Sequence, residues 1–153
     1  MSPHSKEITM LAQRHLNLSI SQRTVLVTSD MVRACRGVDA DTITAQVDAG
    51  ELRWVWDVST GEGDIRELRF WAKEIIAPEF CKGMKPAKAV TEILGSDRAR
   101  WRGVEIAQLL LVSRPQIFRL HEAGDLKGEI AGGTLYVNRA VLEKFLTKRL
   151  VNN

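Results

Sequence analysis

The sequence has few of the residues that build covalent or metal-stabilised frameworks. It holds two cysteines, Cys35 and Cys81, and three histidines among 153 residues. Two widely spaced thiols form no disulfide framework and fit no zinc-binding pattern. We therefore expect reduced cysteines in a cytoplasmic protein, with Cys35 buried on the core face of a helix. We expect no metal site and no cofactor.

Long hydrophobic runs are also missing. A run such as Leu109 to Val112 is far shorter than the roughly 20 residues that cross a bilayer. The first residues show no basic, apolar and small-residue regions of the kind that direct secretion. These patterns predict a protein that is neither exported nor bound to a membrane.

Motifs that support catalysis are absent from the chain. There is no phosphate-binding G-x-x-x-x-G-K loop, no G-x-S-x-G turn and no H-E-x-x-H pair. His4, His15 and His121 are scattered, and the acidic residues stand where helix caps and surface positions explain them. We expect a protein that is not an enzyme.

The charge is divided unevenly along the chain. Residues 1–80 hold nine Lys/Arg and twelve Asp/Glu, a net charge of −3, whereas residues 81–153 hold thirteen and seven, a net charge of +6. Together they give the overall +3. The second half is therefore suited to a polyanionic partner, which the first half would repel.

A short sequence occurs twice, as DAGELR at 48–53 and as EAGDLK at 122–127, 74 positions apart. Apolar positions, helix caps and glycine stops agree around both copies over roughly 45 residues. Past the hairpin, the distance that we assign between corresponding residues falls to about 70, so Trp71 corresponds to Val141. The first hairpin would then be about four residues longer than the second. The sequence therefore predicts a duplicated fold unit.

Each copy is predicted to contain two helices, a hairpin and a further helix. In the first copy we expect helices over 29–35 and 42–50, the second capped by Asp39, strands over 52–58 and 65–68, and a helix from 70. In the second copy we expect helices over 103–111 and 114–123, strands over 126–130 and 134–137, and a last helix capped by Asn138. Ser113 and Gln116 match a capping box.

Three regions follow from this reading. Residues 1–76 would hold an amphipathic helix over 5–16 and the first, degenerate copy. Residues 77–101 would form a basic linker with a short helix in PAKAVTEIL, and residues 102–153 the second copy. The linker cations either follow a phosphate backbone or are simply solvated.

The second copy resembles the excisionase-like and MerR-like winged helix-turn-helix family. The resemblance is strong over 102–150 and weaker over 28–76. The residues that carry it are Glu105 and Ala107, V-S-R at 112–114, and Glu122, Gly124 and Leu126. It implies a mainly α fold with small β-hairpin wings, in the α+β class, as two tandem winged helix-turn-helix units. It also implies sequence-specific binding of double-stranded DNA, with the second helix in the major groove and the wing near the phosphates.

Carried onto this sequence, the resemblance implies a contact set in the second copy. On helix 114–123 the expected outward residues are Arg114, Gln116 and Arg119, because Arg can pair with guanine and Gln with adenine. Phe118 either touches a thymine methyl or is plain packing, and Gly132 and Gly133 either admit the DNA backbone or form a tight turn. The full expected set is Ser113, Arg114, Gln116, Arg119, Lys127, Thr134, Arg139 and Arg102.

The first copy offers a weaker set of candidates. Its second helix has Asp39, Asp41 and Asp48 and no basic residue, so phosphates would be repelled. Trp54 and Trp56 share one strand face, and they form either core or a partner surface. The candidate secondary contacts with DNA or a partner are Arg36, Thr42, Arg53, Trp54 and Trp56. A rival hypothesis is that both copies bind DNA, at half-sites about one helical turn apart.

The resemblance includes more than one role for such a protein. We expect a nucleoid-associated transcription regulator or recombination directionality factor of a bacterial or mobile element. It would act alone, as a homodimer, or with a recombinase or regulatory protein. The alternatives are a replication or partition factor that also binds DNA, and a protein-interaction module that uses winged-helix architecture.

Overall fold

The computed structural model describes residues 24–60, 66–95 and 98–152. In these residues the chain is of the α+β class, with eight helices and two small antiparallel sheets of three strands each. The helix predicted over 5–16 lies outside the described residues. None of the described helices has both the length and the apolar character needed to span a bilayer.

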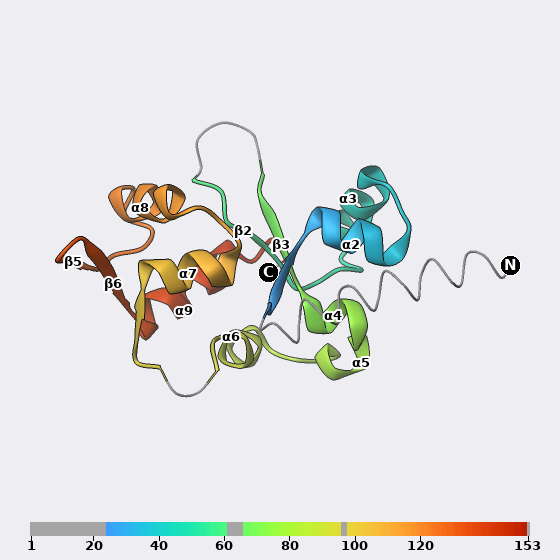
Figure 1. Cartoon of the computed structure of the whole chain (residues 1–153). Coiled ribbons are helices and arrows are strands. Elements are labelled where there is room, and N and C mark those ends of the chain that lie inside the picture. Colours follow the sequence, from blue (N-terminus) through green and yellow to red (C-terminus); the bar gives the residue numbers. More distant parts are fainter. Residues whose placement is uncertain (1–23, 61–65, 96–97, 153) are drawn as a thin grey trace, which may run out of the picture.

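The two predicted copies have the same order of elements, β-α-α-β-β-α (Figure 1). We call residues 26–76 the first unit and residues 100–149 the second unit. The first unit contains β1 (Leu26–Thr28), α2 (Ser29–Arg36), α3 (Ala40–Asp48), β2 (Val55–Asp57), β3 (Leu68–Trp71) and α4 (Ala72–Ile76). The second unit contains β4 (Arg100–Arg102), α7 (Gly103–Leu110), α8 (Arg114–Glu122), β5 (Glu129–Ala131), β6 (Thr134–Asn138) and α9 (Arg139–Arg149). Helices α5 (Pro78–Cys81) and α6 (Pro86–Leu94) join them.

The sheets of the two units also share one strand order. The first is β1-β3-β2 and the second is β4-β6-β5, so the last strand of each unit lies at the centre. Leu26 pairs with Trp71 in the first sheet, and Arg100 pairs with Asn138 in the second. The sequence distance between corresponding residues of the two units is therefore 74 for the first strands, β1 and β4, but 67 for the central strands, β3 and β6. The first hairpin is seven residues longer, not about four, and Trp71 corresponds to Asn138 rather than Val141.

Local signals at the helix ends behave as the sequence predicts at Asp39 and in part at Ser113, whereas Asn138 precedes α9 without a side-chain capping hydrogen bond. Asp39 accepts a hydrogen bond from the Thr42 N–H at 2.8 Å, and Ser113 accepts one from the Gln116 N–H at 3.3 Å. Each hydroxyl or carboxylate thereby satisfies an N–H that has no partner within its helix. The capping box at Ser113 is only half formed, because the Gln116 side chain bonds elsewhere.

Two strands differ from the prediction. β3 begins at Leu68, so Phe70 and Trp71 are strand residues and the following helix starts only at Ala72. β4 was not predicted, because Arg100 and Trp101 were assigned to the linker and Arg102 to the start of the second copy. Both errors have one cause, since a short strand is fixed by the partner strand with which it pairs rather than by its own sequence.

The first sheet lies between two hydrophobic cores, at the centre of Figure 1. Alternate residues of a strand point to opposite faces. One face, with Val27, Val55 and Phe70, packs against α2 and α3. The other, which includes Trp54 and Trp56, joins the core of the second unit. The two units are therefore held together by a shared core and not by a flexible connection.

The segment predicted as a linker contributes to that shared core. Helix α6 confirms the short helix predicted in PAKAVTEIL, and four of its residues are buried, namely Ala89, Val90, Ile93 and Leu94. It packs against α9. Its one lysine, Lys88, is exposed, so the helix is packed while this cation faces solvent, and contact of the linker cations with a phosphate backbone stays a prediction.

Candidate nucleic-acid interface

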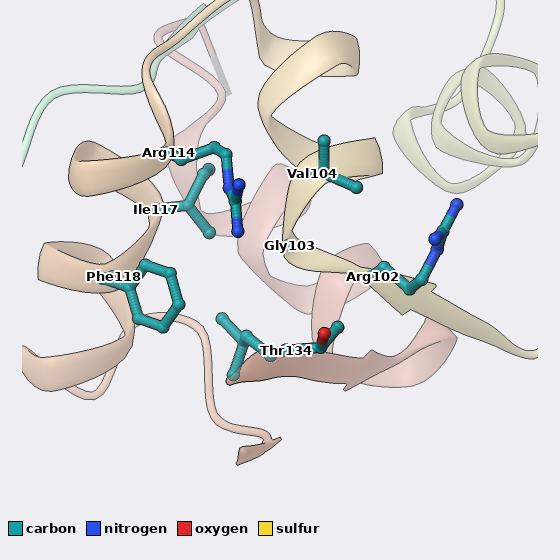
Figure 2. A pocket seen from close by; sticks show the side chains of 8 residues that line it. Arg102, Gly103, Val104, Arg114, Ile117, Phe118 and Thr134 are labelled. Atoms are coloured by element: carbon teal, nitrogen blue, oxygen red, sulfur yellow. The ribbon is translucent and has the colours of Figure 1, made fainter. Parts of the chain in front are cut away.

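A groove in the second unit brings three of the expected DNA-binding residues together. It lies between the start of α7, the helix α8 and the start of β6, and its volume is about 220 Å³. Figure 2 shows Arg114 extending into the space between α8 and α7, with Phe118 beside it and Thr134 on the hairpin. The lining residues are Arg102, Gly103, Val104, Arg114, Ile117, Phe118, Thr134 and Leu135.

Arg114, which lines this groove, and Arg119, which does not, are the two arginines of α8. Both are exposed on α8, and neither forms an ion pair within the described residues. Ile117 and Leu120, on the opposite side of the helix, are fully buried. α8 therefore presents one apolar face to its own unit and one basic face to solvent.

The charge of Arg102 is partly balanced. Its guanidinium points away from Arg114 (Figure 2) and lies 3.3 Å from Glu105, which also accepts a bond from the Arg102 N–H at 2.9 Å. Burial would raise the pKa of Glu105, but this N–H and the nearby Arg98 lower it below its ordinary value. Glu105 therefore remains a carboxylate beside two arginines, which reduces their attraction for an anion.

Gln116 does not face outward as the sequence suggested. Its side-chain amide donates to the Val58 carbonyl at 3.0 Å and to the Glu67 carboxylate at 2.7 Å, both in the first unit. The two N–H donors of this amide are thus occupied. Reading of adenine by Gln116 would require breaking both contacts, so the residue belongs to the junction between units in this structure.

Lys127 lies in a different groove from Arg114. This second groove, of about 270 Å³, runs between the end of α8 and α9, and we call it the lysine groove. Its lining includes Lys127, Lys144 and Lys148, all exposed, whereas its only carboxylate, Asp125, is paired with Arg149 at 2.9 Å. Sequence reasoning missed Lys144 and Lys148, although their spacing of four on a helix places both on one face.

The remaining residues of the expected set have local roles. Arg139 forms an ion pair with Glu143 at 2.8 Å and is mostly buried, so it is less available than predicted. Gly132 and Gly133 both have positive φ, +58° and +78°. This is the geometry of a type I′ hairpin turn, which favours the tight-turn interpretation of these glycines.

The candidates of the first unit are engaged within it. Arg36 donates to Gln46 at 3.1 Å, and the Thr42 hydroxyl donates to Asp39 at 2.7 Å. The Arg53 guanidinium lies 4.6 Å from the centre of the Trp54 ring. α3 carries no basic residue in its last turn and an aspartate in its first, so it lacks the basic face of α8.

Trp54 and Trp56 are not a partner surface. They are 1% and 0% exposed and stack on one another with ring centres 6.2 Å apart. Of the two alternatives the core interpretation is therefore correct, and the core is the one shared with the second unit.

One important residue was missed by sequence reasoning. Arg69 is 6% exposed and lies on the same strand face as Trp71, directed toward the second unit. It donates to the carbonyl oxygens of Leu110 and Leu111, at 2.7 and 2.9 Å. The only available signal was an arginine at an inward position of a strand-like alternation.

Comparisons of this chain with protein-family models, with curated proteins and with solved structures found no match.

Proposed function

We propose that this protein binds double-stranded DNA sequence-specifically, through α8 of the second unit. The observation that carries the proposal is the pair Arg114 and Arg119, exposed on the second helix of a β-α-α-β-β-α unit and free of carboxylate partners among the described residues. A helix of this width fits the major groove. The resemblance of residues 102–150 to winged helix-turn-helix proteins supports the same reading.

The roles of the contacts follow from their chemistry. Arg114 and Arg119 would pair with base edges, where a bidentate arginine–guanine contact contributes roughly 1–3 kcal/mol of discrimination. Phe118, half-buried in the groove, offers an apolar surface for a thymine methyl. Thr134 and Arg102 would contact phosphates, which fix the position of the helix without specifying sequence.

The second unit alone would contact DNA in this proposal. At the positions that correspond to Arg114 and Arg119, 74 residues earlier, α3 has Ala40 and Ala45, and its charged residues are Asp41 and Asp48. Carboxylates are repelled by phosphates. A chain with one DNA-binding face and no catalytic motif is suited to acting as a transcription regulator or a recombination directionality factor.

Selection of bound fragments from genomic DNA tests this proposal. The whole protein should enrich a motif, and the variant with Arg114→Ala and Arg119→Ala should lose it. The control is Arg33→Ala with Arg66→Ala, which removes the same charge from exposed positions of the first unit and should keep the motif. Absence of any motif at moderate salt, or equal loss in both variants, would contradict the proposal.

A further inference from the structure

The turn between α7 and α8 contains a residue in an unfavourable conformation. Leu111 ends α7 with φ of 55° and ψ of 45°, and it is the only non-glycine residue with positive φ in the described part of the chain. The left-handed region is costly for a residue with a β-carbon. The corresponding position in the first unit, 74 residues earlier, holds Gly37 with φ of 66°. The first unit therefore ends this helix with the residue type that suits it, and the second does not.

Arg69 holds this turn from the first unit. The last carbonyls of a helix have no partner within it. Two carbonyls at this end, those of Leu110 and Leu111, receive the Nε and Nη2 hydrogens of Arg69. A cation is also favoured at the negative end of the helix dipole.

A single carboxylate connects both sides of the turn. One oxygen of Glu67 lies 3.1 Å from Arg69, which contacts the turn at its start. The other oxygen accepts from Gln116 at 2.7 Å, in the first turn of α8. Arg69, Glu67 and Gln116 therefore form a continuous chain of hydrogen bonds around the turn, which we call the brace.

We propose that the first unit serves to position α8, and that Arg69 is the positioning residue that fixes the angle between α7 and α8 through the brace. This inference rests on the proposed function only where it concerns DNA. The strained Leu111 is retained because the surrounding bonds over-determine its conformation. The brace sets the pose of Arg114 and Arg119 without itself contacting a base.

The test compares Arg69→Met with Val32→Ala. Val32 lies in the separate core of the first unit, so its truncation destabilises that unit without touching the brace. Amide hydrogen exchange of Val112, Ser113, Arg114 and Gln116 is measured without DNA, since Pro115 has no N–H. Binding to the selected motif is compared with binding to random DNA, and the ratio of the two affinities is the specificity ratio. In Arg69→Met the exchange of these amides should be faster. The specificity ratio should fall roughly tenfold, which corresponds to the loss of about one base contact. Binding to random DNA should be unchanged. Val32→Ala should change neither the local exchange nor the ratio.

Two further variants distinguish loss of the brace from general unfolding of the protein. Glu67→Gln keeps the shape of the side chain and should change exchange and specificity in the same direction by less. Leu111→Gly, placed in the Arg69→Met background, removes the conformational cost and should restore part of the protection. Unchanged exchange in Arg69→Met, or faster exchange with an unchanged ratio, would overturn the brace. If the unsubstituted protein selects no DNA, the proposed function fails while the exchange and rescue measurements still decide the brace.

Discussion

Gly128 is a position at which the second unit has no room for a side chain. A β-carbon there would lie 2.2 Å from the carbonyl oxygen of Tyr136, a backbone atom of the central strand. Backbone within a sheet cannot move aside without breaking its pairing, so Gly128→Ala should destabilise the protein by about 1–3 kcal/mol. Urea denaturation checks this, with the exposed Ala140→Ser as control. An unchanged urea midpoint would contradict this prediction, because it would show that the backbone around Gly128 and Tyr136 accommodates a β-carbon.

Asp57 makes stability depend on pH. Burial would raise the pKa of Asp57, but the N–H groups of Ser59 and Glu67 that donate to it, together with Arg149, lower the pKa below its ordinary value of 3.8. A lowered folded-state pKa means that the contribution to stability is complete above 3.8 and is lost as pH falls through the folded-state value.

Asp57→Asn should therefore reduce the acid sensitivity of the protein. The measurement is the urea midpoint at about pH 7 and at about pH 3. The natural chain should lose more stability between the two conditions than the variant does. Equal losses would mean that this carboxylate titrates alike in the folded and unfolded chains.

The elements were predictable where their signals are local. Helices α2, α3, α7 and α8 begin and end within a few residues of the predicted bounds, because caps and apolar spacing act within one turn. β4 and the start of β3 were missed, because each depends on a partner strand far along the chain. The same limit explains the wrong length difference between the two hairpins.

Helix α9 supports a prediction about salt dependence. Lys144 and Lys148 lie on one face of α9 and line the lysine groove together with Lys127. The one carboxylate in the lining of this groove, Asp125, is already paired with Arg149. If DNA binds as proposed and its backbone reaches this groove, Lys144→Ala with Lys148→Ala should reduce the slope of log affinity against log salt by roughly 1 to 2. The selected motif should not change.

The control for that prediction is Lys82→Ala with Lys88→Ala, which removes two exposed lysines from the segment between the units. A slope that falls equally in both pairs would indicate a general charge effect. A slope unchanged by the α9 pair would place the lysine groove outside the DNA contact.

At the scale of the whole molecule, the relation between the units could not be predicted from the sequence. The sequence indicates the duplication and the basic character of α8, and these need only spacing and charge. It does not indicate that Gln116 would bond to the first unit or that Trp54 and Trp56 would enter a shared core. Such contacts depend on how two folded units dock, which no pattern within either copy specifies.

The shared core predicts that the two units unfold together. Leu26, Trp54 and Trp56 of the first unit share one cluster with Leu110 and Phe145 of the second, so separating the units would expose this apolar surface to water. Calorimetry should show one transition whose calorimetric and van't Hoff enthalpies agree. Two resolved transitions would contradict a shared core. They would indicate two units that unfold independently, joined by a linker as the sequence predicted.

The location of the tryptophans has an optical consequence. All four, Trp54, Trp56, Trp71 and Trp101, lie in the shared core and are at most 7% exposed. None of them is on α8 or in the lysine groove. The intrinsic emission of the protein therefore reports on the junction between the units, with a blue-shifted maximum while they are docked. Ligand binding at α8 should leave the wavelength of the emission maximum unchanged, and a red shift of that maximum should accompany separation of the two units.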